Sequence, residues 1–224
     1  KKLLIQRKLP LSGELYASSS KNATLPIMAA SLLSNEEYVL EDIPNLIDIK
    51  SMSQLLESLG VTIKKSKSSI SLNASKLNSY KAEYNLVRKM RASILVLGPL
   101  LSRFGKAIVS LPGGCAIGTR PIDLHLLGMR KLGAKILIKD GYVIAEAAKG
   151  LYGNCIKLPS VSVGATENII LASVMAKGKT LILNAAKEPE VQDLCNYLNL
   201  AGAKILGAGT NKIKIEGVKS LKSI

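Results

Sequence analysis

Four segments of the sequence carry side chains that could bind phosphate or act on a bound substrate. The first, Ser18-Ser19-Ser20-Lys21-Asn22, combines hydroxyl groups, an ammonium group and an Asn that could cap a helix. Arg88 and Arg91 begin a second apolar stretch, and Ser160-Val161-Ser162-Val163-Gly164 begins a third. Because backbone N–H groups at a helix start point outward and attract anions, these segments predict a site for a phosphorylated ligand.

The fourth segment, residues 111–121, is rich in glycine and holds one thiol and one guanidinium group, Cys115 and Arg120. A thiol with the ordinary pKa of about 8.5 keeps its proton at neutral pH, and a cationic neighbour can turn it into an acid or a nucleophile. Glycine-rich segments of this kind are either catalytic loops or slack connections between elements.

The two other cysteines and the single histidine are expected to have structural rather than catalytic roles. Cys155 and Cys195 have apolar neighbours in the sequence and lack an activating cation, so we expect buried structural thiols. His125, the single histidine, is expected to be a satisfied structural group rather than a base. With one histidine and no Cys-x-x-Cys pair, no metal site is indicated.

Three copies of one pattern position these segments. Leu59-Gly60-Val61-Thr62-Ile63, Leu132-Gly133-Ala134-Lys135-Ile136 and Ala201-Gly202-Ala203-Lys204-Ile205 each follow a stretch with helical apolar spacing. The glycine in each copy is therefore predicted to end a helix and lead into a strand.

Each copy predicts the order helix, strand, helix, strand, strand. The first helices are expected at 23–33, 90–101 and 165–175, the strands that follow at 38–43, 107–111 and 180–183, and the second helices at 47–59, 122–132 and 191–200. The first helices are almost entirely apolar or small, which predicts burial in a shared core. From Ser34, Ser102 and Ala176 the marker glycine lies 26, 31 and 26 positions on, so the middle copy holds an insertion in residues 111–121.

Composition narrows the class of protein. The 224 residues are 47% hydrophobic and carry 31 basic against 16 acidic residues, a net charge of +15. Six basic residues are Arg, and there is one Phe and no Trp, so the guanidinium contacts and aromatic platforms of nucleic-acid binders are scarce. Neither a run of about 18 apolar residues nor a signal-peptide core occurs, and three cysteines are too few for a disulfide scaffold. We expect a cytoplasmic protein that binds neither nucleic acid nor membrane.

Several motifs resemble one family along the whole chain. They are Lys21-Asn22-Ala23, Met90-Arg91-Ala92-Ser93, Pro112-Gly113-Gly114-Cys115-Ala116-Ile117-Gly118, Arg120-Pro121-Ile122-Asp123-Leu124-His125 and Ser162-Val163-Gly164-Ala165-Thr166-Glu167-Asn168. In this order they are similar to the UDP-N-acetylglucosamine 1-carboxyvinyltransferases. The resemblance implies an α/β fold, an inside-out α/β barrel of two domains with three repeats each. The implied reaction is transfer of enolpyruvate from phosphoenolpyruvate to the 3-hydroxyl of UDP-N-acetylglucosamine with release of phosphate, the first committed step of peptidoglycan synthesis.

The resemblance also implies roles for individual residues. Cys115 matches the general acid that protonates the methylene carbon of phosphoenolpyruvate, and no cofactor is implied. Lys21 and Asn22 match contacts to phosphoenolpyruvate. The residues that match contacts to the nucleotide sugar are Arg91, Arg120, Pro121, Ile122, Asp123, Leu124, Ser160, Val161, Ser162 and Val163.

The sequence departs from the family in three respects. Ser18-Ser19-Ser20 stands where the family usually has Ser-Gly-Ala, and Ser160 stands where some members have a basic residue. Residues 21–224 hold three repeats, at about 21–86, 87–158 and 159–224, whereas the family has six. The general base, an Asp, belongs to the second domain. We therefore expect residues 1–20 to be strands of that domain and the chain to be inactive alone.

Two hypotheses from different classes follow. The chain is either the catalytic-loop half of a carboxyvinyltransferase, whose partner is the second domain, or a binding module for nucleotide sugars or phosphate without turnover. The shikimate-pathway enolpyruvyl transferase shares the fold but not the Cys loop. The intact segment around Cys115 favours the first hypothesis.

Overall fold

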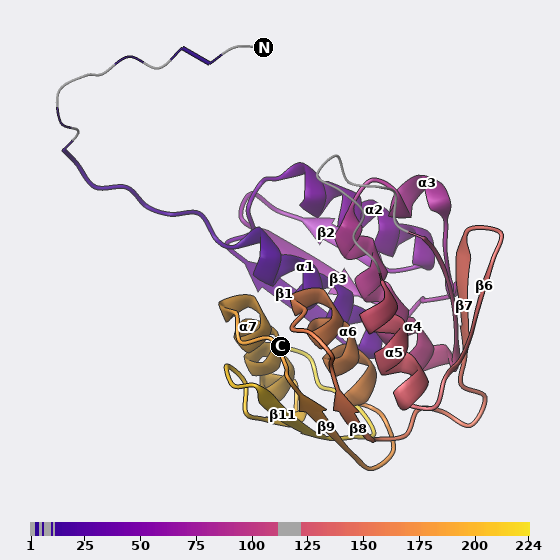
Figure 1. Cartoon of the computed structure of the whole chain (residues 1–224). Coiled ribbons are helices and arrows are strands. Elements are labelled where there is room, and N and C mark those ends of the chain that lie inside the picture. Colours follow the sequence, from indigo (N-terminus) through magenta and orange to yellow (C-terminus); the bar gives the residue numbers. More distant parts are fainter. Residues whose placement is uncertain (1–2, 5, 7–9, 11, 112–121) are drawn as a thin grey trace.

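The computed structural model describes residues 3–4, 6, 10, 12–111 and 122–224. In this part of the chain, three antiparallel or mixed sheets lie outside a group of packed helices (Figure 1). The mixed α/β architecture with buried helices agrees with the predicted fold class.

The elements repeat in the predicted order. The first unit comprises α1 (Lys21–Ala30), the 3₁₀ helix η1 (Ser31–Leu33), β1 (Glu37–Glu41), α2 (Ile47–Leu59), β2 (Thr62–Lys65) and β3 (Ser69–Asn73). The second comprises β4 (Lys81–Ala82), α3 (Tyr84–Val87), the 3₁₀ helix η2 (Arg91–Val96), α4 (Leu97–Phe104), β5 (Lys106–Ser110), α5 (Asp123–Lys131), β6 (Lys135–Lys139) and β7 (Tyr142–Glu146). The third comprises β8 (Cys155–Lys157), α6 (Val163–Ser173), β9 (Lys179–Leu183), α7 (Pro189–Leu200), β10 (Lys204–Leu206) and β11 (Lys212–Glu216).

The three sheets share one topology. Their strand orders are β1-β3-β2, β4-β5-β7-β6 and β8-β9-β11-β10, so the last strand of each unit lies between the two before it. The short strands β4 and β8 add a parallel edge to the second and third sheets, which the sequence did not predict. Because β4 and β8 pair with β5 and β9, these sheets begin a few residues before the expected repeat boundaries at 87 and 159.

Glycine sets the helix ends that define the repeat. The φ values of Gly60, Gly133 and Gly202 are +104°, +97° and +98°. Residues that have a Cβ rarely adopt this left-handed backbone conformation. The predicted helix ends are therefore confirmed. Asp140 and Gly141 both have positive φ and form the turn that joins β6 to β7.

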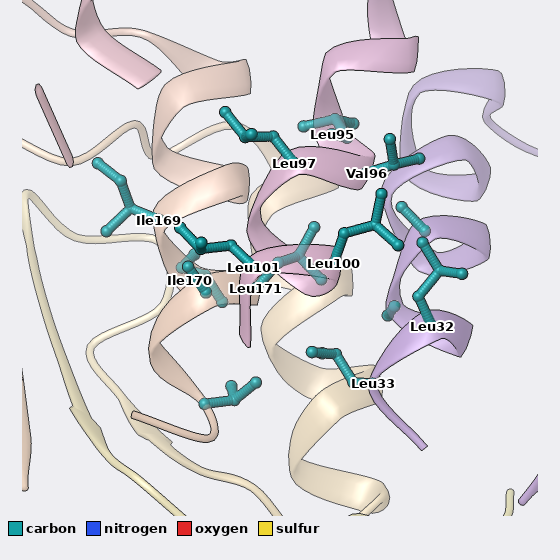
Figure 2. Packing of buried hydrophobic residues seen from close by; sticks show 14 of the residues in the cluster. Leu32, Leu33, Leu95, Val96, Leu97, Leu100, Leu101, Ile169, Ile170 and Leu171 are labelled. Carbon is teal, nitrogen blue, oxygen red and sulfur yellow. The ribbon is translucent and has the colours of Figure 1, made fainter. Parts of the chain in front are cut away.

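The core lies between the first helices of the three units. Leu32 and Leu33 of η1 face Leu100 and Leu101 of α4, and Ile169, Ile170 and Leu171 come from α6 (Figure 2). Every residue of α6 from Ala165 to Ser173 is buried. Since burying one such aliphatic side chain contributes about 1.5 to 3 kcal/mol, packing fixes these helices and hence the position of their amino-terminal ends.

The described residues that precede α1 form neither helix nor strand. The expectation that residues 1–20 pair with a second domain stays a prediction. None of the helices in the described ranges is long and apolar enough to cross a membrane.

Candidate functional site

The start of α6 carries a complete side-chain cap. The hydroxyl of Ser162 accepts a hydrogen bond from the backbone N–H of Ala165 at 3.3 Å, and the Thr166 hydroxyl donates to the Ser162 carbonyl at 2.8 Å. Ser160 and Val161 are exposed just before the helix, and Val163 is its first residue. The cap uses the N–H of Ala165, so an anion at this helix start would be bound by the N–H groups of Val163 and Gly164.

The start of α1 repeats this arrangement. Ser20 accepts from the N–H of Ala23 at 3.3 Å, and the Thr24 hydroxyl donates to the Ser20 carbonyl at 2.8 Å. The capping residue is therefore Ser20, and the expectation of a cap by Asn22 is wrong, because Asn22 already lies inside the first turn. Asn22 is exposed there.

Lys21, the first residue of α1, forms an ion pair that the sequence did not reveal. Its Nζ lies 2.7 Å from Oδ2 of Asp48 in the first turn of α2. The two residues are far apart in the chain, and no motif linked them. The ammonium group is thereby held at the start of α1.

Three helix starts meet at His125. The ring is buried on α5, near Asp123 at the first position of that helix and near Arg91 at the first position of η2. A Cβ placed on Gly164, in the first turn of α6, would lie 3.3 Å from Cε1 of His125. The starts of η2 and α6, which belong to different copies of the repeat, therefore lie close together.

The charge state of His125 follows from this environment. Burial, and to a smaller extent the positive charge of Arg91, lower the pKa of the imidazole to about 4, although the carboxylate of Asp123 opposes both effects. His125 is therefore neutral at physiological pH and suited to hydrogen bonding rather than to acting as a cation.

Both ends of the segment that carries Cys115 are anchored. The N–H of Leu111 donates to the Gly141 carbonyl at 2.8 Å, and Ile122 is the buried capping residue of α5. Cys115, Arg120 and Pro121 themselves lie outside the described residues, so their roles stay predictions. Leu124 follows Asp123 on α5 and is half-buried.

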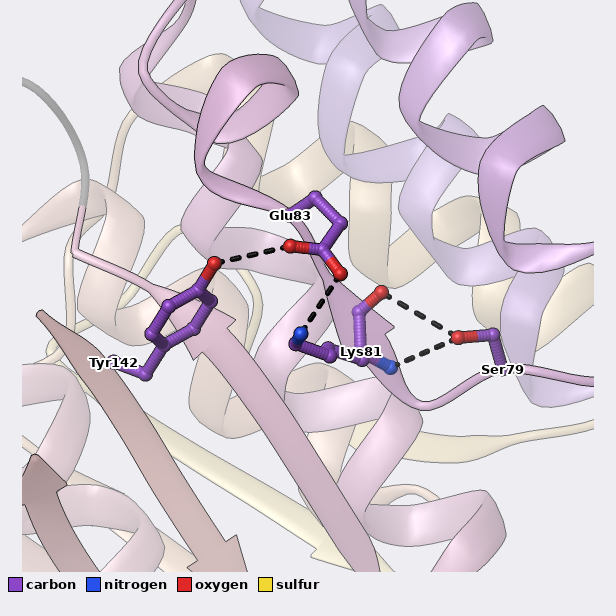
Figure 3. Close-up of polar contacts among 4 residues, drawn as sticks. All are labelled: Ser79, Lys81, Glu83 and Tyr142. Atoms are coloured by element: carbon purple, nitrogen blue, oxygen red, sulfur yellow. Dashed lines mark hydrogen bonds and ion pairs between the residues drawn. The ribbon is translucent and has the colours of Figure 1, made fainter. Parts of the chain in front are cut away.

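A polar network supports the strand that leads into this segment. Ser110, at the end of β5, pairs with Tyr142, whose hydroxyl donates to Oε2 of Glu83 at 3.0 Å (Figure 3). Lys81 Nζ lies 2.9 Å from the other carboxylate oxygen of Glu83. The hydrogen bonds from Lys81 and Tyr142 lower the pKa of Glu83, so the carboxylate that ties β4 to β7 stays ionised.

The two described thiols differ. Cys195 is buried on α7, and burial raises its pKa to about 12, as expected for a structural thiol. Cys155 is exposed on β8, so the expectation of a buried thiol is wrong for it. A period-two strand presents alternate residues to solvent, and here Ile156 takes the buried position.

One cavity of the described chain lies away from these helix starts. It has a volume of about 740 Å³ and lies on the third sheet, among Cys155, Leu181, Lys204 and Leu206. None of the described residues that match substrate contacts lines it. We give more weight to the helix starts, because Arg91 and the first turn of α6 both lie close to the buried ring of His125.

Glu167 is a buried acid that the sequence did not single out. It is 4% exposed on α6, and burial, together with the negative charges of Glu190 and Glu188, raises its pKa to about 8. The carboxyl group is therefore protonated in the folded chain at neutral pH.

Replacing Glu167 by Gln is expected to remove a pH dependence of stability. The folded-state pKa lies above the ordinary value of 4.5, so the stability is fully present below that value and is lost as the pH rises through about 8. The loss is about 1.4 kcal/mol per pH unit across this range. Urea unfolding at pH 5, 6.5 and 8 measures the free energy of unfolding of both proteins. The value for Glu167→Gln should rise relative to that of the unaltered chain as the pH rises. A constant difference between the two proteins would contradict this.

Comparison with known proteins gives the family. The sequence profile described as EPSP synthase (3-phosphoshikimate 1-carboxyvinyltransferase) matches residues 5–224. A UDP-N-acetylglucosamine 1-carboxyvinyltransferase from Helicobacter pylori is 51% identical over 97% of the chain and 52% of its own length. One from Pelagibacter ubique is 52% identical over 100% of the chain and 54% of its own length. The chain thus spans about half the length of the curated relatives that it matches.

Solved structures support the fold. The enolpyruvyl transferase NikO from Streptomyces tendae superposes with a TM-score of 0.82 at 21% identity, covering 95% of this chain and 50% of that one. An EPSP synthase from Acinetobacter baumannii superposes with a TM-score of 0.75 at 19% identity, covering 94% and 48%. The sequence matches show that the chain belongs to the enolpyruvyl transferase family, within which it is similar in sequence to UDP-N-acetylglucosamine 1-carboxyvinyltransferases.

Proposed function

We propose that this chain forms the catalytic-loop part of an enzyme that transfers enolpyruvate from phosphoenolpyruvate to the 3-hydroxyl of UDP-N-acetylglucosamine and releases phosphate. This is the first committed step of peptidoglycan synthesis. The observation that carries the proposal is the 51% identity to a relative of that name over 97% of the chain. The convergence of helix starts around His125, close to Ile122 where α5 begins, supports it.

Each residue type suits its proposed role. The thiol of Cys115 donates a proton to the methylene carbon of phosphoenolpyruvate, which makes the neighbouring carbon electrophilic toward the sugar hydroxyl. A base from a second domain takes the hydroxyl proton. Phosphate then leaves as the added proton is removed and the carbon–carbon double bond re-forms, so atoms and charges balance.

The three proposed cationic contacts could supply about as much binding free energy as micromolar substrate affinity requires. A charge-assisted hydrogen bond contributes about 1.5 to 3 kcal/mol, so Lys21, Arg91 and Arg120 together could supply about 4 to 9 kcal/mol before ordering costs. Micromolar affinity requires about 8 kcal/mol. Replacing any one of the three cations by a neutral residue should therefore weaken substrate binding.

The organisation of the longer protein is part of the proposal. Residues 1–20 would belong to the second domain, and residues 21–224 would form the three-repeat domain with boundaries near 87 and 159. With only three cysteines, too few for a disulfide scaffold, the chain suits a cytoplasmic location.

The 224-residue chain alone is expected to bind UDP-N-acetylglucosamine but to show no enolpyruvyl transfer. General-acid and general-base steps each contribute about 10²- to 10⁴-fold, and the base lies outside the repeats present here. Titration calorimetry measures binding, and phosphate release measures turnover, before and after addition of a polypeptide that carries the other three repeats of a relative.

Restored phosphate release on mixing would support the proposal. Phosphate release by this chain alone at the rate of full-length relatives would refute the expected division of acid and base. If the chain bound the nucleotide sugar but released no phosphate, either alone or with the added polypeptide, the alternative of a non-catalytic binding module would be favoured.

A further inference from the structure

The imidazole of His125 has one partner on the side that faces Asn168. Its Nδ1 lies 3.1 Å from Nδ2 of the Asn168 amide, and both side chains are buried. Asn168 belongs to α6 and His125 to α5, so this contact joins the two helices.

Two backbone groups fix the orientation of the Asn168 amide. Its Oδ1 accepts a hydrogen bond from the N–H of Gly98 at 2.9 Å, and its Nδ2 donates to the Ile94 carbonyl at 2.9 Å. A flipped amide would set a donor against the donor on Gly98 and an acceptor against the acceptor on Ile94. The NH₂ group therefore faces Nδ1 of His125.

This orientation determines the tautomer. Because the group that faces Nδ1 is a donor, Nδ1 must accept, and the single proton of the neutral ring sits on Nε2. The low pKa of the ring, about 4, agrees with a neutral imidazole.

The protonated nitrogen has no hydrogen-bond partner among the described residues. His125 is 1% exposed, and its Nε2 is buried. A Cβ built on Gly164 would lie 3.6 Å from this nitrogen, so Nε2 is directed at the first turn of α6. A buried donor left unpaired costs about 1 to 3 kcal/mol, which a ligand atom could recover.

We propose that Nε2–H of His125 donates a hydrogen bond to an anionic oxygen bound at the start of α6, and that Asn168 is the positioning residue that keeps the proton on this nitrogen. The inference rests on the proposed function, which makes that anion the diphosphate of a nucleoside diphosphate sugar. The N–H groups at the start of α6 and the nearby Arg91 favour the same negative charge.

A matched pair of variants separates the two ring nitrogens. The amide of an Asn at position 125 can occupy the place of Nδ1 but lacks a donor at Nε2, whereas the amide nitrogen of a Gln can reach the place of Nε2. Titration calorimetry with UDP should show His125→Asn binding about 10- to 100-fold more weakly than the unaltered chain, and His125→Gln within about threefold of it. Affinity for uridine, which lacks phosphate, should be the same in all three.

The single histidine allows a direct measurement that needs no variant. In a chain labelled with ¹⁵N-histidine, NMR should show the Nε2–H tautomer, and the Nε2 and attached proton signals should shift on addition of UDP but not of uridine. The opposite tautomer, or signals that stay unchanged at saturating UDP, would overturn the inference even if His125→Asn failed to fold.

The outcomes distinguish the inference from the proposed function. If the unaltered chain bound neither UDP nor UDP-N-acetylglucosamine, both would be wrong. If it bound them and His125→Asn bound equally well, the role of His125 would be wrong and the proposed function would stand.

Discussion

Fosfomycin is expected to add one equivalent to the chain, at Cys115, when UDP-N-acetylglucosamine is present. The drug is an epoxide with a phosphonate that resembles phosphoenolpyruvate, so the cations that hold phosphate would place its ring beside the thiol. Cationic surroundings also favour the thiolate, which is the form that opens the epoxide. Mass spectrometry of the intact chain and of its peptides would locate the adduct.

The chain contains its own controls for this reaction. Cys155 is exposed and should react with iodoacetamide, which needs access alone, but not with fosfomycin. Cys195 is buried, and its raised pKa of about 12 should keep it unreactive toward both reagents. Cys115→Ser should abolish the fosfomycin adduct. An adduct at Cys155, or none at saturating drug and nucleotide sugar, would mean that the site around Cys115 is not preformed in this chain.

Asn168→Ala is expected to lower the free energy of unfolding by about 3 to 9 kcal/mol. The substitution leaves the Gly98 N–H, the Ile94 carbonyl and Nδ1 of His125 buried without their partner, at about 1 to 3 kcal/mol each. Chemical denaturation at neutral pH measures the change. Such a loss is a large share of the stability of a domain of this size.

Asn154→Ala is the matched control for this substitution. Asn154 also makes two hydrogen bonds with backbone groups, those of Lys131 and Cys155, but it is exposed, so water can replace the amide. We expect a loss of about 1 kcal/mol or less. Equal losses of unfolding free energy in the two variants would show that burial of the Asn168 hydrogen bonds adds nothing to their contribution to stability.

Gly98 explains why the Asn168 network forms where it does. A Cβ on Gly98 would lie 2.6 Å from both the backbone and side-chain oxygens of Asn168. The glycine therefore lets α4 approach α6 closely enough for the backbone N–H to reach the amide. Gly98 and Asn168 are 70 positions apart in the sequence, so no local sequence pattern predicts this contact.

Local patterns predicted the regular elements well where they were long and periodic. The predicted helix at 47–59 coincides with α2, because amphipathic spacing and Gly60 define its face and its end. The strands β4 and β8 were missed, since two or three residues of parallel edge strand contain no alternation to detect. The cap at Ser20 was assigned to Asn22, because both residue types are good caps and only the backbone shows which lies at the boundary.

The sequence by itself determined the threefold repeat, the helix ends at glycine, the apolar inner helices and the family, because each of these is written in neighbouring residues or in motifs. Tertiary structure alone decided the pairing of Lys21 with Asp48, the exposure of Cys155, the protonation of Glu167 and the tautomer of His125. These properties depend on distance, burial and charge among groups that are far apart in the chain. Packing of the three units sets those distances, and through them it sets which atoms can donate, accept or hold a proton.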